Sequence, residues 1–247
     1  MVGACRKAED RINREVVNVT TLPIPAELAA LLQAASGGEE LHSDCLAVVQ
    51  APKEPLFGML TAPLDSSLIR LDEELKQGAL NVFILILRFM GDPNLNGAQE
   101  NLFGNYIIQR GLANPSLRDE ILAQVANQVW RNPNVLNSER GWLLLSSCLS
   151  AFLPSQRLAK YLLKLVSDYG PEGYDCVCQH RLLQALQRLN VGPEYVRTYP
   201  PCLLEWTANR KRAHTVLHIH CFDGVSFLCP LHSWTTGEEM AKDILQH

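Results

Sequence analysis

The sequence predicts a mainly α protein, a helical bundle followed by a short ββα unit at the C-terminal end. Two observations predict this fold class. From about residue 67 to residue 190, apolar residues recur at helical spacing in segments that Gly, Pro and Asn separate. After residue 212 the pattern changes to the alternation of a strand, then a turn, a second short strand and a helix.

The composition is that of a soluble folded protein. Of the 247 residues, 47% are hydrophobic and 19% charged, and the formal net charge is −4. Nucleic-acid-binding domains usually carry a net basic face, so we expect no nucleic-acid partner. No run approaches about 18 consecutive apolar residues, and residues 1–14 are polar, so we expect no transmembrane segment and no secretory signal. Eight cysteines without framework spacing favour a reducing, cytoplasmic location.

Two stretches precede the bundle. Residues 1–35 predict two short helices, over 5–17 and over 26–35, the second with Pro25 at its start. Residues 36–66 contain several prolines and glycines and predict an extended linker that packs toward the bundle.

The helical domain is predicted to cover residues 67–196. Its first helix is capped by Ser67 and carries Leu68, Leu71 and Leu75 on one face. A second helix over 77–90 is apolar on most sides, so we expect it to be the buried central helix.

The rest of the bundle is predicted from its start and stop signals. Gly111 should end a helix over 99–110, and Asn114-Pro115 should start one that reaches Trp130. Pro154-Ser155 should start another helix, with Tyr161 among its inward-facing residues. Two more helices are expected over 138–152 and 174–189, and residues 197–212 are expected to form a linker.

The C-terminal residues 213–247 predict strand, turn, strand and helix. In the first strand three apolar residues alternate with two outward histidines: Leu217, Ile219 and Cys221 with His218 and His220. Phe222-Asp223-Gly224 predicts the turn, and Thr235 or Thr236 caps the helix. This order is the first half of a ubiquitin-like fold. A lone hairpin with one helix is marginal in water, so we expect a truncated unit.

Several motifs follow one another at fixed spacing in the helical region. They comprise Gly91, Asp92, Leu117, Arg118, Asp119, Glu120, Gln124, Gln128, Asn132, Pro133, Arg140, Gly141, Trp142, Pro154 and Ser155. In this order these residues resemble the myosin tail homology 4 domain of unconventional myosins. The resemblance gives them structural roles in a helical bundle.

The flanks resemble class XV myosins, of the XV or XVB type. Thr21-Leu22-Pro23-Ile24-Pro25 looks like the junction of neck and tail, and residues 213–247 look like the opening of the first lobe of a FERM domain. The resemblance implies a cargo-binding tail segment without cofactors, located in the cytoplasm with the cytoskeleton. It implies cytoskeletal and scaffold or adaptor partners, with tubulin as a candidate, and actin only through a motor domain outside this chain.

Motifs of the common catalytic sites are missing from the sequence. It has no phosphate-binding loop of the G-x-x-x-x-G-K-[ST] type, no H-E-x-x-H and no G-x-S-x-G. Arg118, Asp119 and Glu120 stand at a helix start, where we expect capping and pairing, with Arg140 as a partner, and not acid–base catalysis. We therefore expect no enzyme in this chain.

Two clusters of potential metal ligands are interpreted as structural. Cys176-Val177-Cys178-Gln179-His180 lacks the two-pair spacing of structural zinc sites. His218 and His220 should face solvent on the first strand, near His214. We therefore expect no metal site.

One surface is a candidate for partner binding. Arg157, Lys160 and Lys164 recur at i, i+3 and i+7 and form a basic stripe along the helix after Pro154. A cationic stripe would suit acidic segments such as the tails of tubulin. The alternative is an ordinary solvated face, because residues 67–196 carry twelve basic and twelve acidic residues.

Three functional hypotheses stay open. The first is a scaffolding and cargo-binding segment of an actin-based motor tail. The second is a cytoskeletal adaptor with the same helical domain but no motor, which differs in what precedes residue 1. The third is a fragment with no independent function.

Overall fold

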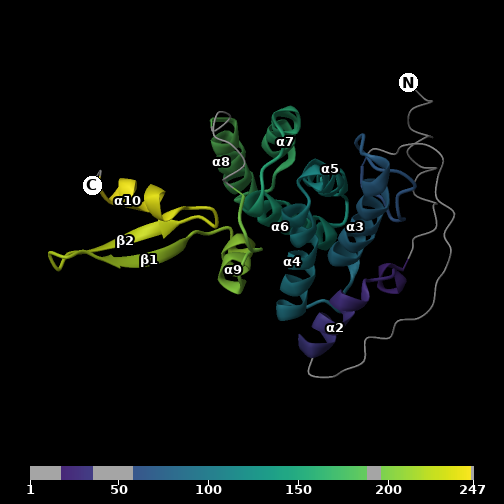
Figure 1. Ribbon diagram of the computed structural model, residues 1–247, viewed down its shortest axis with the longest axis horizontal. Helices are drawn as coiled ribbons and strands as arrows, with labels where there is room; N and C mark the ends of the chain where they lie inside the picture. The colour runs from purple at the N-terminus through teal and green to yellow at the C-terminus, as the bar shows by residue number, and fades with distance from the viewer. Residues whose placement is uncertain (1–17, 36–57, 188–195, 246–247) are drawn as a thin grey trace.

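The computed structural model describes residues 18–35, 58–187 and 196–245, which form a helical body with a projecting β-hairpin (Figure 1). The helices are η1 (Val19–Thr21), α2 (Ala26–Ala35), α3 (Glu73–Gly91), α4 (Gly97–Ala113), η2 (Pro115–Leu117), α5 (Arg118–Val129), α6 (Val135–Ala151), α7 (Gln156–Tyr169), α8 (Tyr174–Gln187), α9 (Leu203–Lys211) and α10 (Gly237–Leu245). The strands β1 (Thr215–His220) and β2 (Ser226–Leu231) pair antiparallel. The mainly α fold with a C-terminal ββα unit is confirmed. The predicted helix over 5–17 and most of the predicted linker lie outside the described residues.

Helix α3 is the central helix of the bundle, as predicted. It contacts α4, α5 and α6, and from Val82 to Met90 nearly every side chain is buried. It ends at Gly91, and the backbone N–H of Asp92 donates to the carbonyl of Arg88. The long apolar run of the sequence therefore becomes one buried helix, since a helix that is apolar on most sides needs neighbours on most sides.

The predicted helix start at Ser67 is wrong. Residues 58–72 form no helix, and α3 begins only at Glu73. The Ser67 hydroxyl donates to the carbonyl of Ile69 at 2.8 Å, and the N–H groups of Leu68 and Ile69 donate to the side chain of Glu120. A distant carboxylate therefore holds these residues in an irregular conformation, which helical spacing alone does not reveal.

The boundary between α4 and α5 is only partly as predicted. Helix α4 continues past Gly111 to Ala113. Gly111 serves close packing within the helix and does not end it, since a Cβ atom there would lie 2.6 Å from the ring of Phe152. Asn114 and Pro115 do start the next segment, and the Asn114 Oδ1 atom accepts from the N–H of Ser116 at 3.1 Å. One 3₁₀ turn, η2, precedes α5.

Helix α7 begins as predicted after Ser155, whose hydroxyl caps the N–H of Leu158. Its inward face contains Ala159, Leu162 and Val166. Tyr161 does not belong to this face: its side chain is 75% exposed, so the prediction of an inward orientation is wrong. It follows Lys160 in sequence and lies one turn after Arg157, on the outer side of the helix.

The predicted linker at 197–212 contains a helix. Helix α9 packs against α4 and α6, and Trp206 is fully buried there. The indole N–H of Trp206 donates to the Oδ1 atom of Asn105 at 2.7 Å. Gly104 makes this packing possible, because any Cβ atom at that position would collide with the indole ring. The short helix α9 is thus part of the bundle, and the buried Trp206 side chain holds it there.

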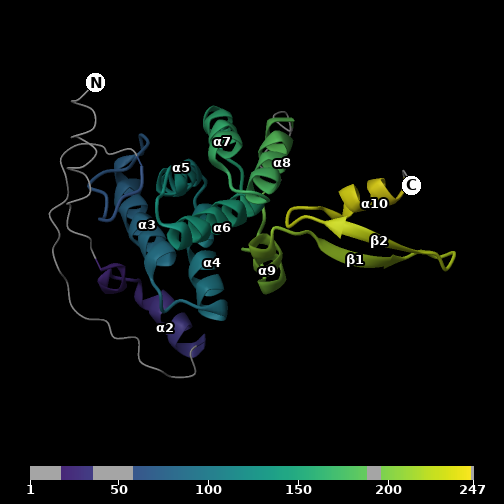
Figure 2. The ribbon, with the colours of Figure 1, turned by 180° about the vertical axis from the view of Figure 1, so that it is seen from behind.

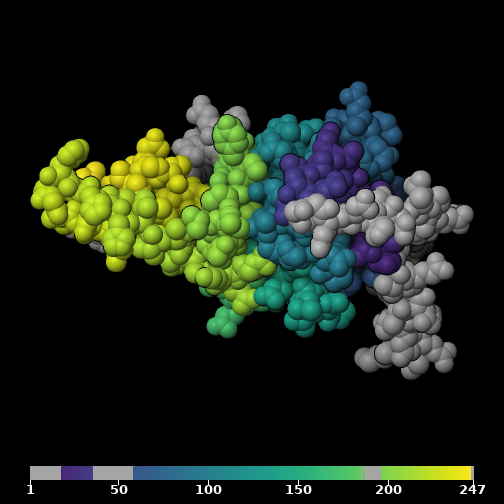
Figure 3. Space-filling model, turned by 90° about the horizontal axis from the view of Figure 1, so that it is seen from below, coloured from purple at the N-terminus to yellow at the C-terminus, as the bar shows by residue number. Residues whose placement is uncertain are grey.

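The hairpin and α10 extend from the side of the body that lies opposite α2 and α3 (Figures 2 and 3). Thr236 and Glu239 cap α10 reciprocally, as the sequence predicts. The alternation of β1 does not produce burial, because α10 packs on β2 and leaves Leu217 45% exposed. The expected half-buried strand is therefore present as a strand but exposed along most of its length.

None of the helices in the described ranges combines the length and the apolar character that a bilayer span requires.

The close approach of α9 to α4 is testable by substitution. We expect Gly104→Ala to lower the free energy of unfolding by about 1–3 kcal/mol, because the added methyl group displaces Trp206. Urea denaturation followed by far-UV circular dichroism measures the change. Gly78→Ala is the matched control, since its Cβ atom would meet only Leu117 at 3.9 Å, and it should stabilise α3 by up to about 1 kcal/mol. Equal stability of Gly104→Ala and the unaltered chain would contradict this packing.

Candidate partner-binding surface

Helix α5 holds the irregular segment before α3 through a buried carboxylate. The two oxygens of Glu120 accept from the backbone N–H groups of Leu68 and Ile69, each at 2.8 Å, and the glutamate is fully buried. The amide of Gln124, one turn later, donates to Glu120 at 2.8 Å and to the carbonyl of Ala79 at 3.0 Å. Glu120 thereby joins residues 68–69 to α5, and Gln124 joins α5 to α3.

The same face of α5 continues this arrangement for two more residues. The Gln128 amide accepts from the N–H of Leu60 at 2.7 Å and donates to its carbonyl at 3.0 Å. The Asn127 amide likewise accepts from the N–H of Gly58 at 2.7 Å and donates to its carbonyl at 2.8 Å. We call Glu120, Gln124, Asn127 and Gln128 the α5 polar ladder. It satisfies backbone groups of residues 58–69 as a neighbouring strand would.

The backbone conformation favours glycine at position 58, where the segment meets Asn127. The φ angle of Gly58 is +101°, a region that L side chains rarely adopt. The segment therefore enters the ladder through a turn that glycine allows.

Arg118 and Asp119 also bind backbone groups. The Arg118 Nε atom donates to the carbonyl of Gly111 at 2.8 Å, and partial burial lowers the pKa of its guanidinium group. The Asp119 Oδ1 atom accepts from the N–H of Ser155 at 2.7 Å, which ties the start of α5 to the start of α7. The geometry assigns these side chains to connections between helices.

Arg140 is not the partner of this group, contrary to the prediction. Its guanidinium donates to the carbonyls of Asp92 and Leu95, and its Nε atom lies 3.6 Å from the carboxylate of Glu100. Glu100 is almost fully buried and also binds Arg210 of α9 at 2.6 Å. Arg140 therefore holds the turn between α3 and α4, and its partners do not include Arg118, Asp119 or Glu120.

The remaining motif residues have packing roles. Asp92 pairs with Arg88 at 3.2 Å, and the Asn132 amide donates to the carbonyl of Gln128 at 3.0 Å. Gly141 faces Met90 and Val129 at distances that leave no room for a Cβ atom. Gly91 packs against Val19, and the side chains of Leu117 and Trp142 are buried. Pro133 is exposed after Asn132, and Pro154 directly precedes Ser155.

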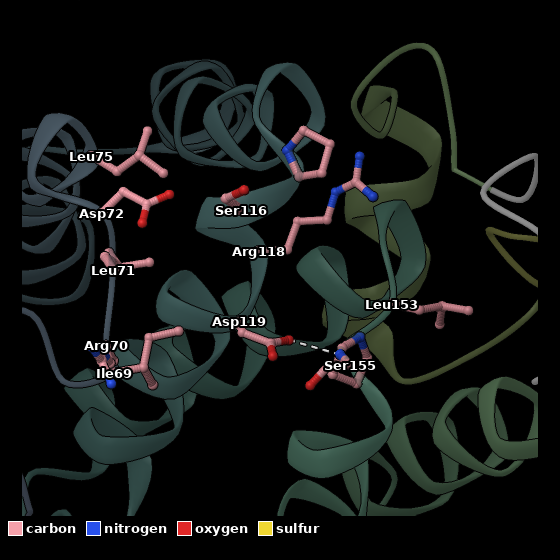
Figure 4. Close-up of a pocket in the computed structure, with 12 residues that line it drawn as sticks. Ile69, Arg70, Leu71, Asp72, Leu75, Ser116, Arg118, Asp119, Leu153 and Ser155 are labelled. Carbon is pink, nitrogen blue, oxygen red and sulfur yellow. Dashed lines mark hydrogen bonds between the residues drawn. The ribbon is translucent and has the colours of Figure 1, made fainter.

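A cleft of about 460 Å³ lies where three helices begin. Asp72 precedes α3, Ser116 comes from η2, Arg118 begins α5, and Ser155 caps α7; Figure 4 shows Asp119 facing Ser155 across the cleft. The lining combines apolar side chains such as Leu71 with both acidic and basic groups. The mixed charge does not favour one class of small ligand.

The predicted basic stripe is exposed along α7. Arg157, Lys160 and Lys164 all lie at the surface, and Tyr161 lies beside them. Lys164 pairs with Asp168 at 2.9 Å, and this hydrogen bond raises the pKa of its ammonium group. Arg157 and Lys160 form no ion pair with any of the described residues. The free charge of the stripe is therefore concentrated in the first two turns of the helix.

The potential metal ligands of α8 do not converge. Cys178 is fully buried, and burial raises the pKa of its thiol to about 12, whereas Cys176 and His180 lie at the surface. His218 and His220 are exposed on β1, as predicted. The sequence does not predict that His180 meets His232, because the two residues are far apart in the chain.

Asn127 was missed as a member of the ladder. Polar residues at 120, 124, 127 and 128 share one face of a helix that is otherwise largely apolar, and this spacing is the signal that could have identified it.

Replacing one carboxylate oxygen of Glu120 by an NH₂ group tests the ladder. We expect Glu120→Gln to lower the free energy of unfolding by about 2–4 kcal/mol, since an NH₂ group then faces a backbone N–H and a charge-assisted hydrogen bond is lost. Urea denaturation measures it. Asp119→Asn keeps an acceptor for Ser155 and should cost about 1 kcal/mol or less. An equal loss of unfolding free energy in the two variants would contradict the proposed role of Glu120 in the ladder.

Comparisons with known proteins agree with this architecture. The MyTH4 domain family model matches residues 104–208. Human unconventional myosin-XV is 52% identical over 97% of this chain, and human unconventional myosin-XVB is 34% identical over 91%. The chain spans about 8% of the length of each of these relatives.

Solved structures show the same fold. The human myosin 7b C-terminal MyTH4-FERM domain, in complex with the harmonin-a PDZ3 domain, has a TM-score of 0.64 and 25% identity over 80% of this chain and 41% of its own. The Dictyostelium discoideum myosin VII MyTH4-FERM MF1 domain has a TM-score of 0.64 and 24% identity over 91% of this chain and 46% of its own. The chain therefore contains a MyTH4 domain, and it resembles class XV unconventional myosins over nearly its whole length.

Proposed function

We propose that this chain is a non-catalytic, partner-binding and scaffolding segment of an actin-based unconventional myosin tail. The observation that carries the proposal is the 52% identity to human unconventional myosin-XV over 97% of the chain. Motor activity would belong to residues outside this chain, because the sequence has no phosphate-binding loop of the kind that a myosin motor requires. The chain would act in the cytoplasm, in association with the cytoskeleton.

The helical domain would serve as a rigid platform for partners. Buried polar networks connect its elements: the α5 polar ladder fixes residues 58–69, and Glu100 joins α4 to Arg140 of α6 and Arg210 of α9. Networks of this kind favour one arrangement of helices over others, because breaking a buried polar contact leaves a donor or acceptor without a partner. Such a platform keeps its surface residues at fixed distances.

The C-terminal ββα unit, residues 213–247, would form the opening of the first lobe of a FERM domain. Its strand, turn, strand and helix order supports this proposal, as does the likeness to MyTH4-FERM structures over 80% or more of the chain. The myosin 7b relative was solved with a PDZ domain of harmonin-a. By analogy, scaffold and adaptor proteins are the partner class that we propose for this chain.

The outer face of α7 is the surface that we propose for an acidic cytoskeletal partner, with the tails of tubulin as the candidate. Arg157 and Lys160 are exposed without ion-pair partners among the described residues, and the ring of Tyr161 is 75% exposed beside them. Two free cations next to an aromatic ring can bind carboxylates and also provide contact area. Because charges balance in the domain as a whole, this attraction would be local and would weaken with added salt.

Charge reversal on α7 tests this surface. We expect Lys160→Glu with Lys164→Glu to weaken binding to stabilised microtubules about 5- to 30-fold, which corresponds to about 1–2 kcal/mol for two reversed surface charges. Cosedimentation at low and at physiological ionic strength measures the affinity, and removal of the acidic tubulin tails by protease should have the same effect.

Lys211→Glu with Lys242→Glu is the matched control. It makes the same change in net charge at two exposed lysines of α9 and α10, away from the stripe. Its affinity should stay within about twofold of the unaltered chain. Unchanged binding by the α7 variant, or an equal loss in the control, would remove the stripe from the proposed function.

A further inference from the structure

Three histidines and a tryptophan meet where the hairpin unit joins the helical body. His232 follows β2, and its ring is nearly parallel to that of Trp234, with centroids 4.7 Å apart. His180 of α8 stacks on the same His232 ring at 4.9 Å, and His214, which precedes β1, meets it edge-on at 5.4 Å. His232 therefore lies between the bundle and the hairpin unit and contacts rings from both.

The cluster is a stack of rings and does not have the geometry of a metal site. The His180 and His232 rings are within 28° of parallel, so their nitrogens do not point to a common centre. No group of three possible ligands suited to a metal ion occurs within the described ranges. The cluster is therefore held by ring contacts, and a positive charge on the central His232 ring would lie against two other imidazoles.

Among the described residues, the carboxylates near His232 already bind other groups. On α8, the buried Arg181 lies next to His180, and its guanidinium is 5.3 Å from the Trp234 ring. On α9, burial alone would raise the pKa of Glu205, but hydrogen bonds from Arg197, Cys202 and Ser233 hold it below its usual value. On α10, Glu239 caps Thr236 and accepts from Gln184 at 3.2 Å. Both carboxylates are thus engaged elsewhere.

A proton on His232 is disfavoured at this place. Burial lowers the pKa of His232, and the neighbouring His180 and His214 lower it further. The Trp234 face would attract an imidazolium ion, but Arg181 is already within cation–π distance of that ring. In the undocked state His232 is surrounded by water and regains its ordinary pKa of about 6.5.

We propose that the junction between the helical bundle and the hairpin unit is a pH-sensitive hinge that opens in mildly acidic solution, with His232 as the group that takes up the proton. This proposal does not depend on the identity of the partner. Because the docked state binds fewer protons, docking is strongest above about pH 6.5 and weakens as the pH falls below that value. Binding that uses both parts of the chain would weaken over the same range.

Hydrogen exchange in the full 247-residue chain tests the hinge. The readout is the protection of amides in residues 232–240, corrected for intrinsic exchange, between pH 7.5 and pH 5.5, with α6 amides as the internal reference. For one proton taken up on opening, we expect protection at 232–240 to fall as the pH is lowered, by at most about tenfold over this range, while α6 stays protected. A flat profile at 232–240 would overturn the proposal.

Two variants and one control assign the effect. His232→Gln is neutral at every pH and should give a flat profile even if its protection is lower throughout. If His232→Gln opens the junction at all pH values, His180→Gln serves as the second test. Removing this neighbouring imidazole should reduce the change in protection at 232–240 between pH 7.5 and pH 5.5. His218→Gln, on the exposed face of β1, should keep the full response. A full response in His232→Gln, or an unchanged one in His180→Gln, would overturn the role of this cluster.

Discussion

The carboxylate of Glu120 is the contact on which the arrangement of this domain depends. It is buried without a cationic partner among the described residues, and its two oxygens accept instead from the N–H groups of Leu68 and Ile69. Asn127 and Gln128 extend the contact to Gly58 and Leu60, and Gln124 links Glu120 to the carbonyl of Ala79 in α3. Residues 58–69 lead directly into α3, the central helix. The position of the core helix is thereby set by polar side chains on a neighbouring helix as well as by apolar packing.

The free energies of desolvation and hydrogen bonding explain why a core can hold such a network. Removing a carboxylate from water costs several kcal/mol, and each charge-assisted hydrogen bond recovers about 1.5–3 kcal/mol. For Glu120, the free energy of desolvation and the gain from its hydrogen bonds therefore nearly cancel. Losing one hydrogen-bond partner would leave much of the desolvation cost without compensation. The same reasoning applies to Glu100, which is shared by Arg140 and Arg210. The two networks add little to net stability but make alternative helix arrangements expensive. This suits a domain that presents surface residues at fixed positions.

Local sequence signals predicted those elements that local chemistry determines. Asn114-Pro115 starts a helical segment and Ser155 caps α7, because these residues satisfy backbone groups within a few positions of themselves. The segment at Ser67 and helix α9 were predicted wrongly for a common reason: both depend on distant partners, Glu120 in one case and the space above Gly104 in the other. The exposure of the basic stripe was predictable from helical spacing. Glu120, Gln124 and Gln128 were predicted only as motif residues and Asn127 was missed, because nothing local indicates that the ladder binds backbone groups about 45 to 70 residues earlier.

The central claim is that residues 58–69 are a fixed part of the domain because α5 binds their backbone. Amide hydrogen exchange measured by NMR at Gly58, Leu60, Leu68 and Ile69 tests it most directly, since these four N–H groups donate to the ladder. The account predicts that all four are protected to a degree comparable with the amides of α5 and lose protection together with them. Exchange of the four at the rate of an unstructured peptide, while α5 stays protected, would contradict it.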